Sequence, residues 1–235
     1  MINLTSQDDS IRSIDGRFFQ LVSEHVGIRP FIPETDAKEA ERIDTDYYHH
    51  LGAPVSSISD CFKIQDTQGF VQDHSSHPGK LRGFILYTRI RNLRTWYDQD
   101  GKPAGSWEEN KSLWESSAIK AKGIEYPQPT DLVILSSAVD RSDDNPGERM
   151  GMSAAFLNLG MVGKANQLGL AIVAYNWDKD QLLRAIYQEC GYNYLGTLED
   201  CYAKGEHSHL FLRVRTNKLP PSEPSKFIGP NPCRI

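Results

Sequence analysis

The residues best suited to chemistry lie between Glu148 and Gly196. Gly151 and Ser153 stand just before a long apolar stretch, and this pattern predicts the first turn of a helix. The first turn of a helix has free backbone N–H groups that bind anions, and small residues there let a group such as a pyrophosphate approach the backbone. We therefore expect an anion site at this turn.

Other side chains with chemical potential follow in the same half of the chain. Tyr187 lies near the end of a predicted helix, where its hydroxyl group could donate a proton. His207 and His209 are two residues apart on a predicted strand, so both face the same side. Either histidine could act as a base or contact a substrate. Together with His74 and His77 they could instead bind a metal, but no carboxylate clusters with them, and we predict no metal site.

Composition limits the classes of function. The chain has 235 residues, 39% apolar residues and a net charge of −5, which is typical of a soluble globular protein and argues against binding to a nucleic-acid backbone. No apolar run is long enough to cross a bilayer, and the first residues do not resemble a signal peptide. The four cysteines form no C-x-x-C pair. We expect a cytoplasmic protein with reduced thiols and no zinc ribbon.

The elements that must position these residues follow from the hydrophobic pattern. A single domain is predicted: residues 1–80 are mostly helical, 81–215 form the sheet core, and 216–235 are a proline-rich tail. The run 132–139 (LVILSSAV) predicts a central strand buried on both faces. The remaining predicted elements are helices at 14–25, 33–51, 107–121, 151–168 and 180–189, strands at 60–65, 81–93 and 170–175, a loop at 66–80, and a hairpin of 194–203 with 206–215.

From residue 132 to residue 215 the chain resembles the GNAT acyltransferase superfamily. The family pattern Q/R-x-x-G-x-G/A aligns with Glu148–Ser153, a Gly-Leu pair ends the helix at Gly169-Leu170, and Y-x-x-x-G-F/Y aligns with Tyr187–Tyr192. The resemblance implies an α/β fold of three αβα layers, with a mixed, splayed central sheet and an N-terminal helical extension.

The resemblance also implies a reaction. It would be the transfer of an acyl group from a pantetheine thioester, such as acetyl-CoA or an acyl carrier protein, to the amine of a small molecule or amino acid. The pantetheine would lie between the strands at 132–139 and 170–175, Tyr187 would protonate the departing thiolate, and His209 is the candidate base. The residues implied to bind the donor are Ala138, Val139, Arg149, Met150, Gly151, Met152, Ser153 and Asn176.

The loop before the helix departs from the family pattern. Glu148 replaces glutamine or arginine, and Asp140, Asp143 and Asp144 precede it. Because carboxylates repel a pyrophosphate, these residues widen the expected donor from coenzyme A alone to a pantetheine thioester in general. A donor carried on an acyl carrier protein needs no contact with an adenosine diphosphate. Arginines at 82, 89, 91 and 94 could attract such an acidic carrier, although a half-exposed strand with a solvated face explains them more simply.

Two alternatives remain open at this point. The segment Ala53-Pro54-Val-Ser56-Ser57, with Phe62 and the helix at 153–170, also resembles nitroreductase-like flavoproteins, which would imply FMN and a redox reaction. The second alternative is a non-catalytic, GNAT-shaped binding protein that has lost the cofactor.

Overall fold

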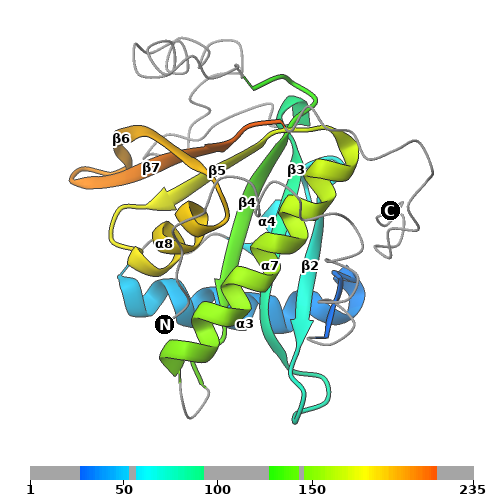
Figure 1. Ribbon diagram of the computed structural model, residues 1–235. Coiled ribbons are helices and arrows are strands. Elements are labelled where there is room, and N and C mark those ends of the chain that lie inside the picture. The colour runs from blue at the N-terminus through cyan, green and yellow to red at the C-terminus, as the bar shows by residue number, and fades with distance from the viewer. Residues whose placement is uncertain (1–26, 53–56, 93–126, 143–145, 216–235) are drawn as a thin grey trace, which may run out of the picture.

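The computed structural model describes residues 27–52, 57–92, 127–142 and 146–215 (Figure 1). The predicted helices at 14–25 and 107–121, the tail at 216–235, and Ala53–Ser56 lie outside the described residues.

A seven-stranded mixed sheet forms the centre of the fold. Its spatial order is β1-β2-β3-β4-β5-β7-β6, and β4 and β5 are parallel while all other neighbours are antiparallel. The strands are β1 (Ile28–Pro30), β2 (Gln68–Asp73), β3 (Leu81–Arg89), β4 (Leu132–Val139), β5 (Ile172–Trp177), β6 (Asn193–Ala203) and β7 (Glu206–Arg213). The predicted central strand and C-terminal hairpin are thus confirmed.

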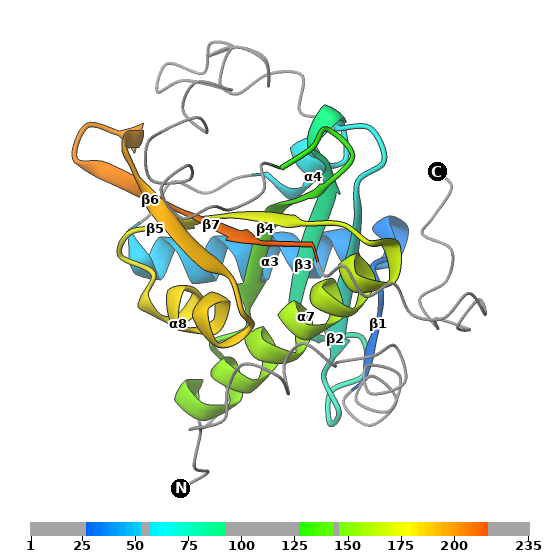
Figure 2. The same cartoon turned by 45° about the horizontal axis from the view of Figure 1, so that its top comes forward.

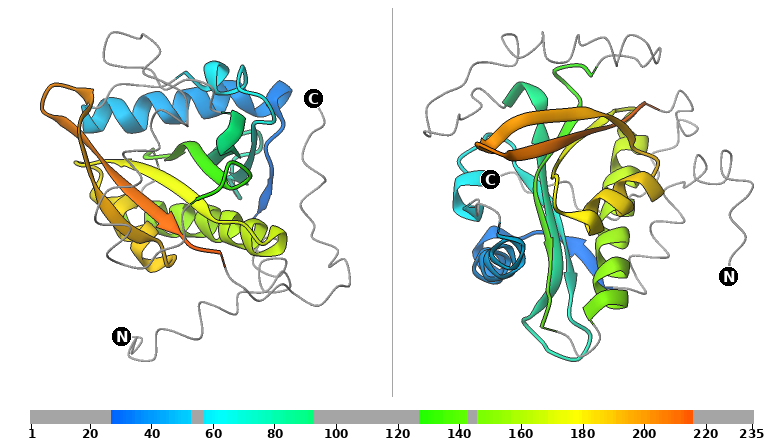
Figure 3. Two further views of the ribbon diagram at one scale, coloured as in Figure 1. Left: turned by 90° about the horizontal axis from the view of Figure 1, so that it is seen from above. Right: turned by 90° about the vertical axis from the view of Figure 1, so that its left-hand side faces the viewer.

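Helices cover both faces of the sheet. The helices α3 (Pro33–Leu51) and α4 (Ile58–Cys61) lie on one face, and α7 (Pro146–Leu168) and α8 (Gln181–Glu189) lie on the other (Figures 2 and 3). Buried residues of α3 and α7 pack against β3 and β4, including Ile43, Leu157 and Met161. The predicted three-layer αβα architecture is confirmed.

The sheet begins earlier in the chain than the sequence predicts. Residues 66–80 are not all loop, because β2 lies among them, and the strand expected at 60–65 is replaced by the short helix α4. Gly69 misled the prediction: a Cβ there would lie 2.5 Å from the Ile85 carbonyl oxygen, so the residue that signals a loop is needed for close strand packing. Strand β1 also pairs with β2, so the region 1–80 contributes two strands as well as helices.

Strand β3 differs from its prediction in burial. It is buried along most of its length rather than half-exposed, and it ends at Arg89 before a 3₁₀ turn at Ile90–Asn92. Arg82 and Arg89 stand at opposite ends of this strand, roughly 23 Å apart at about 3.3 Å per residue. Arg94 lies outside the described residues. The arginines of β3 therefore do not form one patch.

Asp131 fastens the end of the sheet where β4 and β5 meet. Its buried carboxylate accepts hydrogen bonds from the backbone N–H groups of Gln128 (2.6 Å) and Ala171 (3.0 Å) and forms an ion pair with Arg215. The Leu132 N–H also donates to the Ala171 carbonyl oxygen at 3.0 Å. This one side chain thus links the starts of both parallel strands.

Asp131→Asn should lower the free energy of unfolding by about 2–3 kcal/mol, the range for losing a hydrogen bond to a charged group. The amide nitrogen would face donors where the carboxylate now accepts. Urea denaturation of the two proteins would measure the difference. A stability equal to that of the wild type would show that Asp131 does not hold the strands together.

Candidate active site

Strands β4 and β5 diverge after a short parallel contact. Only Leu132 with Ile172 and Val133 with Val173 are paired, after which β4 continues to Val139 and β5 to Trp177 without pairing to each other. The pairing of β3 with β4 shifts at the same level, between Leu86 and Tyr87, as in a β-bulge. A bulge bends a strand and increases its twist. The predicted splay of the central sheet is therefore present, with its open end toward Val139 and Trp177.

Helix α3 places polar side chains at this opening. The carboxylate of Asp44 accepts a hydrogen bond from the hydroxyl of Ser136 on β4 at 2.7 Å. The Tyr48 hydroxyl donates to the carbonyl oxygen of Ser137 at 3.1 Å. Spacing along a helix explains the arrangement, because residues three and four apart share one face. We call the group Asp44, Tyr47, Tyr48, Ser136 and Asp180 the polar cluster.

Tyr47 and Asp180 connect the two helical layers across the open end of the sheet. The Tyr47 hydroxyl donates to the two carboxylate oxygens of Asp180 at 3.0 and 3.1 Å. Asp180 is also the N-cap of α8, where its carboxylate accepts the Leu183 N–H at 3.0 Å. Burial raises the pKa of Asp180, and burial with the nearby Asp180 charge keeps the pKa of Tyr47 well above its ordinary value. Tyr47 therefore remains a hydrogen-bond donor.

Asp44 has an unusual environment for a carboxylate. Its residue is 0% exposed, and in the part of the chain that the structure describes its Oδ2 atom has no hydrogen-bond partner. Burial and, to a smaller extent, the Glu41 charge raise the pKa of Asp44 to about 7, although the hydrogen bond from Ser136 lowers it. A carboxyl group that titrates near neutral pH can accept a proton during turnover.

Tyr187 is brought to the polar cluster, although it is fully buried. Its ring packs against Tyr192 and Phe211 with centroid distances of 5.1 and 5.3 Å. Tyr187 also raises the pKa of Tyr47 and of Tyr48, after the larger effect of burial in each case. It is thus close enough to both tyrosines of α3 to influence their pKa values.

His209 is not brought to the polar cluster. It is half-buried on β7, opposite Asn176 of β5, and its Nδ1 atom lies 3.0 Å from the Thr197 hydroxyl. Burial, with the neighbouring Arg184 charge, lowers its pKa. None of the hydrogen bonds seen among the described residues joins His209 to the cluster. Asp44 is therefore a better candidate for the base than His209, which was predicted for that role.

The predicted glycine turn is wrong in its position. Helix α7 begins at Pro146, so Gly151, Met152 and Ser153 lie inside the helix, where backbone N–H groups bond to carbonyl oxygens one turn earlier. Proline favours the first helical position because its ring fixes a helical φ angle. Met150 and Ser153 are buried, whereas Met152 is half-exposed. The free N–H groups belong to the turn that starts at Pro146.

Gly151→Ala should stabilise the protein by about 0.5–1 kcal/mol, because alanine is favoured over glycine inside a helix. A Cβ at this position would meet only Leu182 Cδ1, at 3.9 Å. Thermal and urea denaturation would measure the change. Gly52→Ala is the matched control and should destabilise, since Gly52 ends α3 with φ +73°. Weaker binding of coenzyme A by the Gly151 variant would restore the glycine-turn interpretation.

The loop after β4 is less acidic than its sequence indicates. Asp140 pairs with Arg42 of α3 at 3.1 Å and accepts hydrogen bonds from Ser142. Burial alone would raise the pKa of Asp140, but these hydrogen bonds outweigh it and lower the pKa. Asp143 and Asp144 lie outside the described residues. Repulsion of a phosphate by Asp140 is therefore largely compensated.

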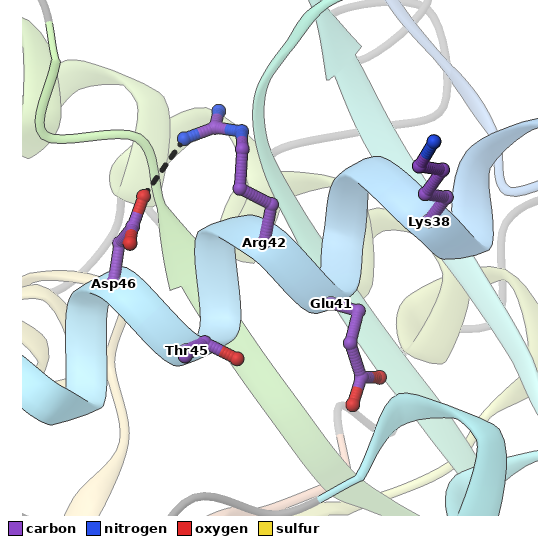
Figure 4. A pocket seen from close by; sticks show the side chains of 5 residues that line it. All are labelled: Lys38, Glu41, Arg42, Thr45 and Asp46. Atoms are coloured by element: carbon purple, nitrogen blue, oxygen red, sulfur yellow. Dashed lines mark hydrogen bonds and ion pairs between the residues drawn. The ribbon is translucent and has the colours of Figure 1, made fainter.

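A hollow of about 380 Å³ lies on the outer side of α3, away from the polar cluster. Arg42 and Asp46 turn toward each other there, whereas Glu41 and Thr45 point in another direction (Figure 4). The hollow is lined by Lys38, Glu41, Arg42, Thr45 and Asp46. These side chains do not converge on a common point, so the hollow is a weaker candidate than the opening of the sheet.

Neither a metal-binding cluster nor a membrane-spanning helix is found in the described part of the chain. No three histidine, cysteine or carboxylate side chains within it come together as a metal site would need. His74 and His77 approach each other on the surface, with Nδ1 atoms 3.1 Å apart, while His207 lies on β7. No helix there has the length and apolar character to cross a membrane.

Sequence reasoning missed most of the polar cluster. Asp44, Tyr47 and Tyr48 lie on a helix that was expected only to pack, and Asp180 was expected only to begin a helix. One signal was available: Asp44 follows Ile43 and lies three residues before Tyr47, on the buried side of α3. A carboxylate at such a position is rare unless it is paired or functional.

Comparison with known proteins shows the fold. No protein-family model and no curated protein sequence matches the chain. Among solved structures it is similar to FeeM, an N-acyl amino acid synthase from uncultured soil microbes, with a TM-score of 0.54, 14% identity, and coverage of 80% of this chain and 88% of that one. The ribosomal-protein-S18-alanine N-acetyltransferase of Escherichia coli gives a TM-score of 0.51, 12% identity, and coverage of 81% and 96%.

A third similar structure is Arabidopsis thaliana NAA60 in complex with acetyl-CoA, with a TM-score of 0.50, 14% identity, and coverage of 80% of this chain and 97% of that one. At such identities the likeness establishes the fold alone, and this fold is GNAT-like, as the resemblance implied. The nitroreductase-like alternative with FMN receives no support from these structures.

Proposed function

We propose that the chain is an N-acyltransferase, which moves an acyl group from a pantetheine thioester to the amine of a small molecule or amino acid. The observation that carries the proposal is the divergence of β4 from β5 directly over the polar cluster. The similarity of the fold to N-acyltransferase structures, one of them an N-acyl amino acid synthase, supports the same reaction class.

The diverging strands suit an extended pantetheine arm. Beyond Val133 the side of β4 that faces β5 has no ladder partner among the described strands. The amides of pantetheine can form hydrogen bonds with such a strand edge, much as a peptide does when it adds to a sheet. A backbone N–H near Ala138 and Val139 would polarise the thioester carbonyl, and Asn176 would line the opposite strand.

Tyr187 is the proposed proton donor to the departing thiolate. The amine nitrogen attacks the thioester carbonyl carbon, the carbon–sulfur bond breaks, and the thiolate takes the phenolic proton. A thiol has a reference pKa near 8.5 and tyrosine one near 10, so positioning close to the sulfur is what makes this transfer effective. Burial beside Tyr192 and Phe211 fixes the ring for that task.

An assay that compares different donors decides which carrier holds the acyl group. The helical geometry of Gly151–Ser153 removes N–H groups from pyrophosphate binding, whereas the pairing of Asp140 with Arg42 removes an obstacle to it. The separation of Arg82 from Arg89 weakens the argument for a carrier-protein patch on β3. We therefore propose the pantetheine thioester as the common element of the donor, with acyl-CoA and acyl carrier protein as its two sources.

The test is an assay with purified protein, a mixture of primary amines and amino acids, and acyl groups of several lengths. Each acyl group is offered on coenzyme A, on pantetheine alone and on an acyl carrier protein. Released thiol and the mass of the N-acyl product are measured. An amide product supports the proposal, and the fastest donor identifies the source. If no product forms and no donor stabilises the protein against heat, the non-catalytic alternative is favoured. A bound flavin in the absorption spectrum would favour the flavoprotein alternative.

A further inference from the structure

Asp44 differs from the other buried carboxylates that the structure describes. Asp36 pairs with Arg29 at 2.7 Å, Asp131 pairs with Arg215, and Asp180 accepts hydrogen bonds from Tyr47 and a helix N-terminus. Asp44 has one hydrogen bond, from Ser136, and its buried Oδ2 atom has no partner among the described residues. Burying a carboxylate with so little compensation is costly, so such groups in native proteins usually serve a function.

Asp44 and Ser136 lie beside the proposed binding site of the donor. Ser136 immediately follows the irregularity of β4, at the level where β4 separates from β5. Asp44 belongs to α3, which lies on the face of the sheet opposite α7 and α8 (Figure 3). Tyr48, whose hydroxyl donates to the neighbouring Ser137 carbonyl oxygen, is half-buried. Tyr187 of α8 lies on the other side, where the thiolate would depart.

The charged and titratable groups around Asp44 raise its affinity for a proton, so its carboxylate can act as a proton acceptor near neutral pH. Glu41 and Tyr48 are on its own helix, and Cys61 faces it from α4. Burial, and then the Asp44 charge, raises the pKa of Cys61 to about 12. From β4 only the hydroxyl of Ser136 reaches Asp44 in the described residues, and no cation contacts it there. The hydrogen bond from Ser136 is thus the one contact among the described residues that lowers the pKa of Asp44.

We propose that Asp44 takes the proton of the acceptor amine through the hydroxyl of Ser136, an inference that rests on the proposed acyl transfer. As the amine nitrogen bonds to the thioester carbonyl carbon, its proton passes to the Ser136 oxygen while the Ser136 proton passes to Asp44. The carbon–sulfur bond breaks and the thiolate receives the Tyr187 proton. Between turnovers Asp44 gives one proton to solvent and Tyr187 regains one, so no other reactant is needed. Ser136 touches the amine, and Asp44 is a positioning residue that acts through it.

The test is the pH profile of kcat/KM for amide formation in four proteins. The wild type should rise with pH through an inflection near the pKa of Asp44, about 7, and then level off. Asp44→Asn should lose the inflection and fall about 10²–10³-fold at pH 8, with an unchanged KM for the donor. Ser136→Ala should behave in the same way, whereas Ser136→Thr, which keeps a hydroxyl, should retain activity within about tenfold.

Glu41→Gln is the matched control on the same helix. Glu41 makes no contact with Ser136 in the described residues, but its charge raises the pKa of Asp44, so the variant should keep its rate and move the inflection to lower pH. If Asp44→Asn keeps the inflection and loses activity equally at every pH, Asp44 is only structural and the relay is wrong. A wild type that forms no amide with any donor overturns the acyl transfer as well. The two failures are therefore distinct.

Discussion

Asp44→Asn is expected to raise the free energy of unfolding at pH 8 by about 2–4 kcal/mol. The pKa of Asp44 rises from 3.8 to about 7 on folding, mainly because of burial. Each pKa unit corresponds to about 1.4 kcal/mol, so the charged carboxylate costs about 4 kcal/mol, less the penalty of an amide that lacks a partner. Asparagine keeps the shape and can still accept the Ser136 hydrogen bond. Stability gained by replacing a site residue is the usual sign that function maintains it.

The direction of the pKa shift of Asp44 determines how the stability of the protein changes with pH. The folded-state pKa is raised, so the folded protein binds more protons than the unfolded chain between about pH 4 and 7, and stability falls as pH rises through that window. Below it both states are protonated and the cost disappears, so the two proteins should converge near pH 4. Urea denaturation at several pH values measures this. Asp36→Asn, which breaks the pair with Arg29, is the control and should destabilise. A wild-type advantage over Asp44→Asn at pH 8 would contradict the assignment.

Tyr187→Phe is expected to lower kcat by about 10²–10⁴-fold, the usual contribution of a general acid, with little change in KM. The proton is transferred only as the thiolate departs, so its loss affects the transition state more than the bound substrate. Phenylalanine keeps the ring packing against Tyr192 and Phe211, and the fold should be preserved. Initial rates of thiol release over a range of donor concentrations would separate kcat from KM.

Tyr192→Phe provides the matched control for this substitution. Tyr192 is also buried, and its ring centroid lies 5.1 Å from that of Tyr187. Its hydroxyl has no hydrogen-bond partner in the described part of the chain, so its removal should leave kcat unchanged. Equal kcat values for the wild type and Tyr187→Phe would remove Tyr187 as the acid and leave it as a core aromatic residue.

The second half of the fold follows well from the sequence. The run 132–139 is apolar on both faces and became the central strand β4 without a shift of its ends, and the helical spacing of α8 located Tyr187. The order of elements from residue 132 onward carried the resemblance. Such local patterns suffice because each element shows its own periodicity.

The elements and site residues that the sequence did not predict depend on contacts between distant residues. Strand β2 is marked by Gly69, which is a loop signal in sequence but a close-packing site in the sheet. Helix α7 starts at Pro146, which sequence reasoning assigned to the loop. Asp44 and Ser136 are 92 residues apart, and Tyr47 and Asp180 are 133 apart, so no local pattern joins them. The site is therefore visible only after the layers are assembled.

A pantetheine thioester is proposed to bind where β4 and β5 diverge, above the polar cluster. Backbone amide chemical shifts in NMR, followed while S-acetyl-pantetheine is added, test it most directly. Binding at this site should cause concentration-dependent shifts at Ala138, Val139 and Asn176 and at the Tyr48 amide of α3. Lys38 and Asp46, which line the hollow on the outer side of α3, should not move. Shifts confined to that hollow would rule out binding between β4 and β5. The absence of any shift, at a concentration that supports acyl transfer, would rule it out as well.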